Sequence, residues 1–135
     1  MKVYIHIAGF TKALDMPFKP TTGELIYFSW DFRKEFTHDI ATIILDNYEI
    51  YKDQGRKLLK EDCHDCCVDD YCHEPISFDL WGFDTIECSF WDMDDKTQEV
   101  RYNIVIAESK PRDKVCYCSE ELYIKLLKNA VGIYE

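Results

Sequence analysis

Apolar and polar residues alternate along five segments of the chain, with the period of two that is typical of half-buried β-strands. In the first segment, Val3, Ile5 and Ile7 fall on one side and Tyr4 and His6 on the other. Prolines and a glycine then mark a loop over residues 11–23, and we expect the strands on either side of it to pair. The five predicted strands are residues 2–10, 24–32, 76–83, 85–93 and 99–109.

From Thr37 the pattern changes to the spacing of a helix. Ile40, Ile44 and Tyr48 recur at intervals of four residues, which predicts a helix that runs on to Lys60. The alternative is a hairpin about residues 46–47, but that Asp-Asn dipeptide lacks the glycine that two-residue hairpins favour. We therefore expect a helix in this part of the chain.

A second helix is predicted close to the C-terminus. Ser119 is a good N-cap residue, and Glu120 and Glu121 follow it in the first turn. Lys125 and Lys128 come later in the segment, as the helix dipole favours. Four residues are expected to face inward, namely Leu122, Leu126, Leu127 and Ala130.

The order of these elements is strand, strand, helix, three strands, helix, and this grouping is typical of an α+β fold. We expect a single domain over residues 1–135, with a mostly antiparallel five-stranded sheet and two helices packed on one face. The buried sheet face is expected to carry Ile76, Phe78, Leu80, Ile86, Cys88, Phe90, Val100, Tyr102, Ile104 and Ile106. The opposite face is expected to carry Asp79, Trp81, Glu87, Ser89 and Trp91.

Composition supports a folded chain, since 47% of the 135 residues are hydrophobic and 15% are aromatic. No apolar run approaches the roughly 20 residues of a membrane span, and residues 1–10 lack the apolar core of a signal peptide. The seven cysteines cannot all pair within one chain, which disfavours a disulfide scaffold. We therefore expect a cytoplasmic protein.

Charge is distributed unevenly along the chain. The net charge is −10, yet the 35 residues from Glu61 to Asp95 hold twelve acids and no basic residue. A local field of that sign repels phosphate groups, so direct binding to DNA, RNA or an anionic membrane is not expected. The same field attracts basic surfaces, such as the clefts of nucleic-acid enzymes. The plainer interpretation is that the acids only keep a small protein soluble.

The first functional hypothesis is an acidic protein-binding module. In size and charge the chain is similar to small acidic immunity proteins, and we expect an inhibitor or antitoxin-like protein that occupies the basic site of a nuclease-type partner. Trp81 and Trp91 lie among the acids, and tryptophan is a common interface anchor. The expected partner-binding residues are Asp65, Asp69, Asp70, Asp79, Trp81, Glu87, Trp91, Asp92, Asp94 and Asp95. Such a protein requires no cofactor.

A second hypothesis is a small zinc-stabilised adaptor or regulatory domain. Cys63 and Cys66 form a CxxC pair, and Cys116 with Cys118 forms a second close pair, so that together they provide the four thiolates of a structural zinc site. Ligand identity stays open, because further cysteines and histidines lie nearby. These alternatives are His64, Cys67, Cys72 and His73. The plainer interpretation is that some cysteines are small buried side chains and the others lie in an exposed loop.

A third hypothesis is an enzyme with dispersed catalytic residues. The chain contains no GxSxG, Walker, GxGxxG or HExxH motif. His6 and His38 are candidate general bases, with Asp39 or Glu35 as partners, but histidines in such positions are more often structural. We therefore expect a binding protein and not an enzyme.

Overall fold

A computed structural model describes residues 1–61, 76–80, 82–108 and 119–132, and within these ranges the fold is α+β. The chain divides into two compact units. Met1–Ser29 and Trp81–Pro111 make up the first unit, and Trp30–Leu80 and Arg112–Glu135 make up the second. The α+β class is as predicted, whereas the prediction of a single domain over residues 1–135 stays a prediction.

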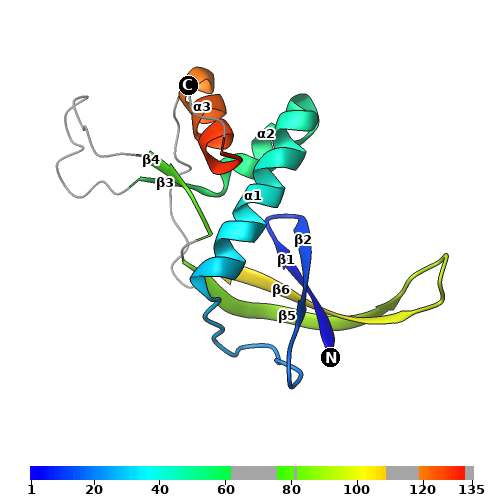
Figure 1. The fold of residues 1–135 in the computed structure, drawn as a ribbon. Helices are drawn as coiled ribbons and strands as arrows, with labels where there is room; N and C mark the ends of the chain where they lie inside the picture. The colour runs from blue at the N-terminus through cyan, green and yellow to red at the C-terminus, as the bar shows by residue number, and fades with distance from the viewer. Residues whose placement is uncertain (62–75, 81, 109–118, 133–135) are drawn as a thin grey trace. The chain divides into compact units, whose positions relative to one another are not determined.

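The first unit contains a four-stranded mixed sheet (Figure 1). Its strands are β1 (Lys2–Ile7), β2 (Phe10–Asp15), β5 (Phe83–Met93) and β6 (Val100–Glu108), in the order β2-β1-β6-β5. The pairs β1–β2 and β5–β6 are antiparallel hairpins, and the central pair β1–β6 is parallel. The buried hydrophobic residues of these strands are Val3, Ile5, Ile7, Phe10, Phe83, Ile86, Tyr102, Ile104 and Ile106.

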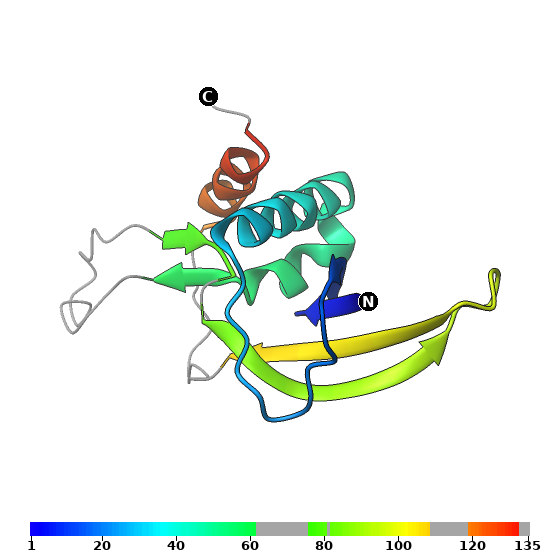
Figure 2. The same cartoon turned by 60° about the horizontal axis from the view of Figure 1, so that its bottom comes forward.

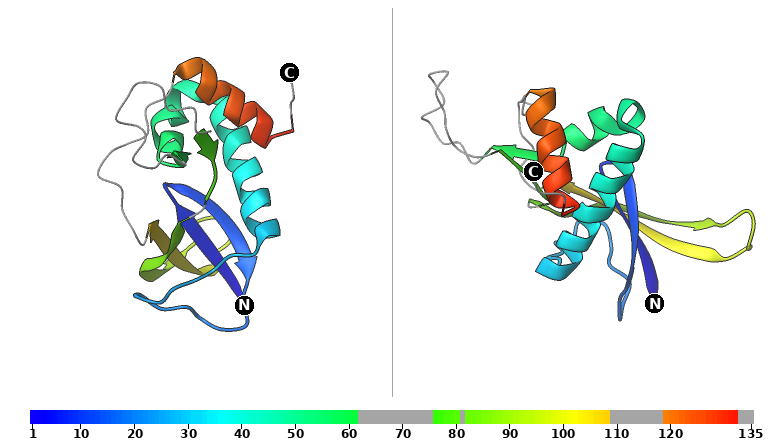
Figure 3. Two further views of the ribbon diagram at one scale, coloured as in Figure 1. Left: turned by 90° about the vertical axis from the view of Figure 1, so that its left-hand side faces the viewer. Right: turned by 45° about the horizontal axis from the view of Figure 1, so that its top comes forward.

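The second unit contains three helices and a short two-stranded antiparallel sheet. The helices are α1 (Trp30–Asp46), α2 (Tyr48–Arg56) and α3 (Glu120–Ala130), and α1 packs against both of the others (Figure 3). The small sheet pairs β3 (Leu59–Glu61) with β4 (Ile76–Phe78). None of the helices in the described ranges has both the length and the apolar composition of a membrane span.

The predicted five-stranded sheet was wrong at its N-terminal side. Residues 24–32 are not a strand, since Leu25 makes only an isolated bridge to Thr85 and α1 already begins at Trp30. The hairpin partner of β1 is β2, in the segment predicted as a loop. The chain reverses earlier because Ala8 and Gly9 both have positive φ, the conformation of a two-residue type I′ hairpin.

Three further differences concern the helices and the predicted meander. The helix predicted from Thr37 begins about two turns earlier, at Trp30. Asn47 separates it into α1 and α2, so the described helices number three and not two. The C-terminal helix is confirmed, with Ser119 as its N-cap. The third predicted strand pairs with β3 and not with β5, so the expected meander is reduced to the β5–β6 hairpin.

The predicted faces of β5 were also wrong beyond Ile86. Ile86 pairs with Ile106 and Ser89 pairs with Ile104, so two residues separate this pair of positions on β5 and only one separates them on β6. This bulge reverses the alternation, because one extra residue moves every later side chain to the other face. Phe90, expected in the core, is therefore 42% exposed, and Cys88 is exposed as well.

Candidate functional site

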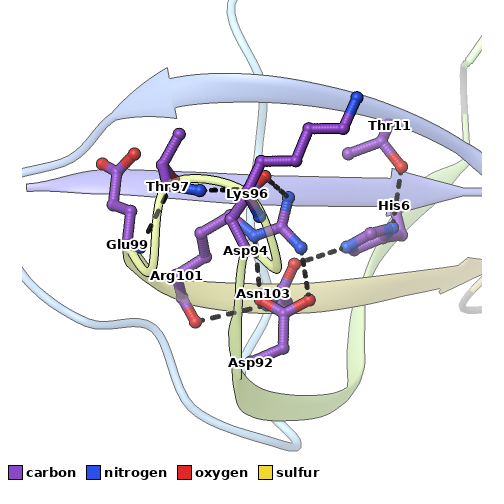
Figure 4. A network of polar contacts seen from close by, with 9 residues as sticks. All are labelled: His6, Thr11, Asp92, Asp94, Lys96, Thr97, Glu99, Arg101 and Asn103. Carbon is purple, nitrogen blue, oxygen red and sulfur yellow. Dashed lines mark hydrogen bonds and ion pairs between the residues drawn. The ribbon is translucent and has the colours of Figure 1, made fainter.

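A chain of polar side chains crosses all four strands of the first unit's sheet on one face (Figure 4). Because side chains alternate along a strand, β1 buries Val3, Ile5 and Ile7 and turns His6 to the opposite face. The paired residue on β2 is Thr11, and it lies on the same face. Asn103 on β6 and Asp92 on β5 complete this row of side chains.

Asn103 connects the histidine to the carboxylate, and it is only 2% exposed. Its amide nitrogen donates to Asp92 Oδ1 at 2.9 Å, so its carbonyl oxygen must point toward His6 Nε2, which lies 2.8 Å away. Nε2 therefore carries a hydrogen and donates it. In neutral His6, Nδ1 then accepts the hydroxyl of Thr11, at 2.9 Å. The network thus selects one tautomer of the histidine.

Arg101 holds the other side of the Asp92 carboxylate. Its Nε donates to Oδ1 at 3.0 Å and its Nη2 to Oδ2 at 2.8 Å, in the two-pronged geometry that suits guanidinium and carboxylate groups. These bonds, followed by the bond from Asn103, lower the pKa of Asp92 below its ordinary value. Arg101 also lies 3.6 Å from the Asp94 carboxylate. The guanidinium group of Arg101 therefore forms ion pairs with two acids of the hairpin, Asp92 and Asp94.

Asp94 also organises the turn between β5 and β6. Its Oδ1 accepts the backbone N–H groups of Lys96, at 2.8 Å, and Thr97, at 3.0 Å. These two bonds are the main reason that the pKa of Asp94 is lowered. The backbone N–H of Asp94 donates to the carbonyl of Glu99 at 2.9 Å, which closes the hairpin. Asp92 and Asp94 thus fix the shape of the β5–β6 hairpin.

Trp91 lies on the opposite face of β5 from Asp92 and is 51% exposed. Its indole packs against the ring of Tyr102, with 4.9 Å between ring centroids, and the hydroxyl of Tyr102 donates to the carbonyl of Pro20. The ammonium group of Lys19 lies over the indole, 4.4 Å from its centroid. The tryptophan is therefore held in place and accepts a cation on its face.

The same hairpin exposes apolar and acidic side chains together. Met93 is 52% exposed and Val100 is 56% exposed, and they pair with each other next to Trp91. Glu87 and Asp95 are exposed acids. From Phe83 to Glu108 the sequence holds seven acids and two basic residues, a net charge of −5. This hairpin, Phe83–Glu108, is the candidate interaction surface.

The structure brings together some of the predicted partner-binding residues and leaves others untested. Glu87, Trp91, Asp92, Asp94 and Asp95 all lie on the β5–β6 hairpin. Asp79 belongs to the second unit, where its carboxylate accepts the backbone N–H of Leu80 at 2.6 Å. The remaining predicted residues, Asp65, Asp69, Asp70 and Trp81, lie outside the described residues.

The zinc hypothesis also depends on residues beyond the described ranges, namely Cys63, Cys66, Cys116 and Cys118. In the part of the chain that the structure describes, no cluster of three or more His, Cys, Asp or Glu side chains has the arrangement of a metal site. The alternative ligands His64, Cys67, Cys72 and His73 likewise lie outside it. Structural zinc stays a prediction.

The two histidines singled out from sequence have different surroundings. His38 Nδ1 lies 3.8 Å from Asp39 Oδ1, and both side chains are about half exposed, at 53% and 48%. His6 instead is bonded to Asn103 and Thr11, two neutral groups, and neither predicted carboxylate partner appears among its bonds in the described ranges. Asp39 therefore lies beside His38, which is one of the pairings expected from the sequence, but both side chains are exposed to solvent.

Sequence reasoning missed Arg101 and Asn103 as partners of Asp92. The signal was present, because both alternate with the apolar residues Tyr102 and Ile104 and so must share the polar face of β6. The pairing register of β5 and β6 could not be predicted from the sequence. It places Arg101 opposite Asp92 and Asn103 opposite Phe90.

Comparisons with known proteins add no relative of this chain. No family model matches it, and neither the curated proteins nor the solved structures gave a match.

Proposed function

We propose that this chain is an acidic protein-binding module that occupies the basic site of a partner protein. Its finer role is that of a cytoplasmic inhibitor, of the immunity or antitoxin-like kind, which neutralises a nuclease-type enzyme. The observation that carries the proposal is the β5–β6 hairpin, where a half-exposed Trp91 is supported by Tyr102 and lies among acids.

Trp91 has the properties of an interface anchor. Tryptophan is enriched among the residues that dominate binding energy, and a ring already fixed by packing loses little conformational freedom on binding. The cation of Lys19 over the indole indicates that the ring face suits a lysine or arginine. The ring is therefore a fixed and half-exposed contact surface for a partner.

The acids of the hairpin divide into two groups. Asp92 and Asp94 are already bonded to Arg101 and to the turn, so we assign them to positioning the hairpin. Glu87 and Asp95 are exposed, and we assign them to attracting and contacting the basic partner. Because Arg101 is engaged by Asp92 and Asp94, the freely presented charge of the hairpin is mainly negative.

A binding experiment with the tryptophan removed tests the proposal. The partner is captured from the native host on the immobilised chain and identified, and its dissociation constant is measured for the wild type and Trp91→Ala. Loss of a central anchor is expected to weaken binding roughly 30-fold, which corresponds to about 2 kcal/mol.

The matched control is Tyr27→Ala, which removes an aromatic side chain that is 79% exposed in the same unit but outside the hairpin. It is expected to change the dissociation constant less than twofold. Equal affinities for Trp91→Ala and the wild type would move the interface away from this hairpin and remove the main support for the proposal.

A further inference from the structure

β5 forms one edge of the four-stranded sheet, and described residues of the first unit pair with only the first part of that edge (Figure 2). The backbone of Ile86 exchanges bonds with the segment before α1, donating to Glu24 at 2.9 Å and accepting from Gly23 at 2.8 Å. Ile26 donates to the carbonyl of Asp84 at 2.7 Å. Beyond Ile86, no described residue continues this pairing.

The hydrogen bonding of the hairpin determines which backbone groups face the open edge. Asp94 donates to Glu99, and in an antiparallel pair hydrogen-bonded and non-hydrogen-bonded positions alternate from there. Asp92 and Phe90 therefore direct their N–H and C=O groups toward β6. The N–H and C=O groups of Ser89, Trp91 and Met93 point outward, and no described residue bonds to them.

In the described ranges, the stretch from Cys88 to Met93 has little of the usual protection of an exposed edge strand. Natural edge strands carry lysine or proline, are very short, or are covered, because an open row of N–H and C=O groups attracts another strand. β5 has neither residue between Cys88 and Met93, whereas the opposite edge strand β2 is shorter and carries Lys12. The bulge before Cys88 leaves the open stretch regularly paired to β6.

We propose that the partner binds by adding an extended segment to β5 from Cys88 to Met93, as a fifth strand of this sheet. The proposal rests on the proposed function and specifies how the partner is held. Main-chain bonds to the three outward residues provide affinity, and the side chains of the hairpin select the sequence of the segment.

The chemistry of the edge identifies the segment as alternating apolar and basic residues. On one face, an added strand lies beside Trp91 and Met93, where apolar side chains pack. On the other face it lies beside Phe90, whose exposed ring accepts lysine or arginine, and the exposed acids Glu87 and Asp95 of the hairpin attract the same cations. A second copy of this chain fits poorly, because its own β5 would bring like charges together.

A synthetic peptide, acetyl-KVKVKVKV-amide, tests this mode of binding with the full chain. The peptide KKKKVVVV has the same composition and charge without the alternation, and it is expected to bind at least tenfold more weakly. Added KVKVKVKV should slow hydrogen exchange at the amides of Ser89, Trp91 and Met93. The amides of Phe90 and Asp92, already directed to β6, should show no change.

Ser89→Pro removes one outward N–H, which an edge strand tolerates, and Ser89→Thr is the control that keeps it. The proline variant should lose at least tenfold in affinity for KVKVKVKV and the threonine variant less than twofold. If the proline variant does not fold, hydrogen exchange of the wild type with and without KVKVKVKV still tests whether the peptide binds along β5.

Three results would overturn this inference. They are equal binding of both peptides, binding without slowed exchange at the three amides, and a dimer of the free chain that Ser89→Pro dissociates. The first two leave the proposed function intact, because surface charge alone would then hold the partner. Failure of the proposed function would instead appear as wild-type affinity of Trp91→Ala for the captured host partner.

Discussion

Asn103 connects the two halves of the polar face of the first unit. Its amide donates to Asp92 and its carbonyl accepts from His6, so a buried side chain satisfies both of its polar ends across two neighbouring strands. Buried polar groups are costly when unpaired, and this pairing fixes the side chains on either side of it. At this scale the structure explains why Asp92 is held in one position.

The lowered pKa of Asp92 makes its contribution to stability depend on pH. A carboxyl whose pKa is lower in the folded than in the unfolded chain stabilises the fold above its unfolded value, and it loses this effect as pH falls through the folded value. Asp92→Asn should therefore lower the unfolding temperature at pH 6, and its difference from the wild type should shrink below about pH 4.

Thermal unfolding between pH 3 and pH 7 measures this effect. The control is Asp95→Asn, which removes an exposed carboxylate from the same hairpin and should change the unfolding temperature little at any pH. A constant difference between Asp92→Asn and the wild type over the whole range would contradict the assignment of the Arg101 and Asn103 bonds.

Gly55 is a second residue whose role is set by its neighbours. It is buried within α2, and an added Cβ would overlap the hydroxyl of Tyr123 and the side-chain end of Ile44. The Tyr123 hydroxyl donates to the carbonyl of Lys52 at 2.9 Å, so it cannot move away freely. Overpacking of this kind costs about 1–3 kcal/mol. Alanine gains about 1 kcal/mol over glycine in a helix, so we expect Gly55→Ala to lower the free energy of unfolding by up to about 2 kcal/mol.

Denaturant unfolding of Gly55→Ala measures this cost, with Asp53→Ala on an exposed position of the same helix as its control. The control should lie within about 0.5 kcal/mol of the wild type. A more stable Gly55→Ala variant would mean that the contact with Tyr123 relaxes without cost.

At the scale of elements, the position of α3 and its N-cap could be predicted from its sequence. Ser119 accepts the backbone N–H of Leu122 at 3.1 Å, as its position before two glutamates indicated. Of the four residues expected to face inward, only Leu127 is buried, whereas Leu122, Leu126 and Ala130 are half-buried. The other buried side chain of the helix is Tyr123, which the pattern did not single out.

Removal of this cap gives a direct test. Ser119→Ala should cost about 1 kcal/mol in unfolding free energy, whereas Ser119→Asp keeps an acceptor and should cost little. Equal losses for both variants in denaturant unfolding would show that the hydroxyl does not cap the helix.

The strands were less predictable because their pattern does not encode pairing. Strands β1, β5 and β6 were recognised from alternation, but the parallel pairing of β1 with β6 depends on contacts between residues about a hundred positions apart. Alternation before α1 was misread, since Phe32, Phe36 and Ile40 also have helical spacing. The bulge near Glu87 carries no proline or glycine to signal it.

At the scale of the whole molecule, charge was the most readable property of the sequence. The acidic block begins at Glu61, the last residue of β3 in the second unit, and ends on the hairpin of the first. Sequence alone predicted acids and a tryptophan together on the hairpin, but not that Arg101 engages Asp92 and Asp94. To tell the acids that Arg101 engages from the acids that stay exposed, the pairing register of β5 and β6 must be known.

Metal content is a second property of the whole molecule that can be measured directly. If Cys63, Cys66, Cys116 and Cys118 hold a structural zinc ion, protein purified without added metal should contain about one zinc per chain. A chelator should then lower its unfolding temperature. Protein free of metal, with unfolding unaffected by the chelator, would contradict the zinc hypothesis.

The most direct test of the central claim is the salt dependence of binding to the captured partner, measured for two variants of equal charge. Glu87→Lys with Asp95→Lys changes the hairpin, and Asp46→Lys with Asp53→Lys makes the same charge change on exposed positions of the helical unit. For the wild type, affinity should fall at least tenfold between about 50 and 500 mM NaCl, because salt screens exposed charges. The hairpin variant should bind at least tenfold more weakly at low salt, and the helical variant much less so. Salt-independent binding, or equal loss in both variants, would contradict an acidic hairpin that binds a basic partner.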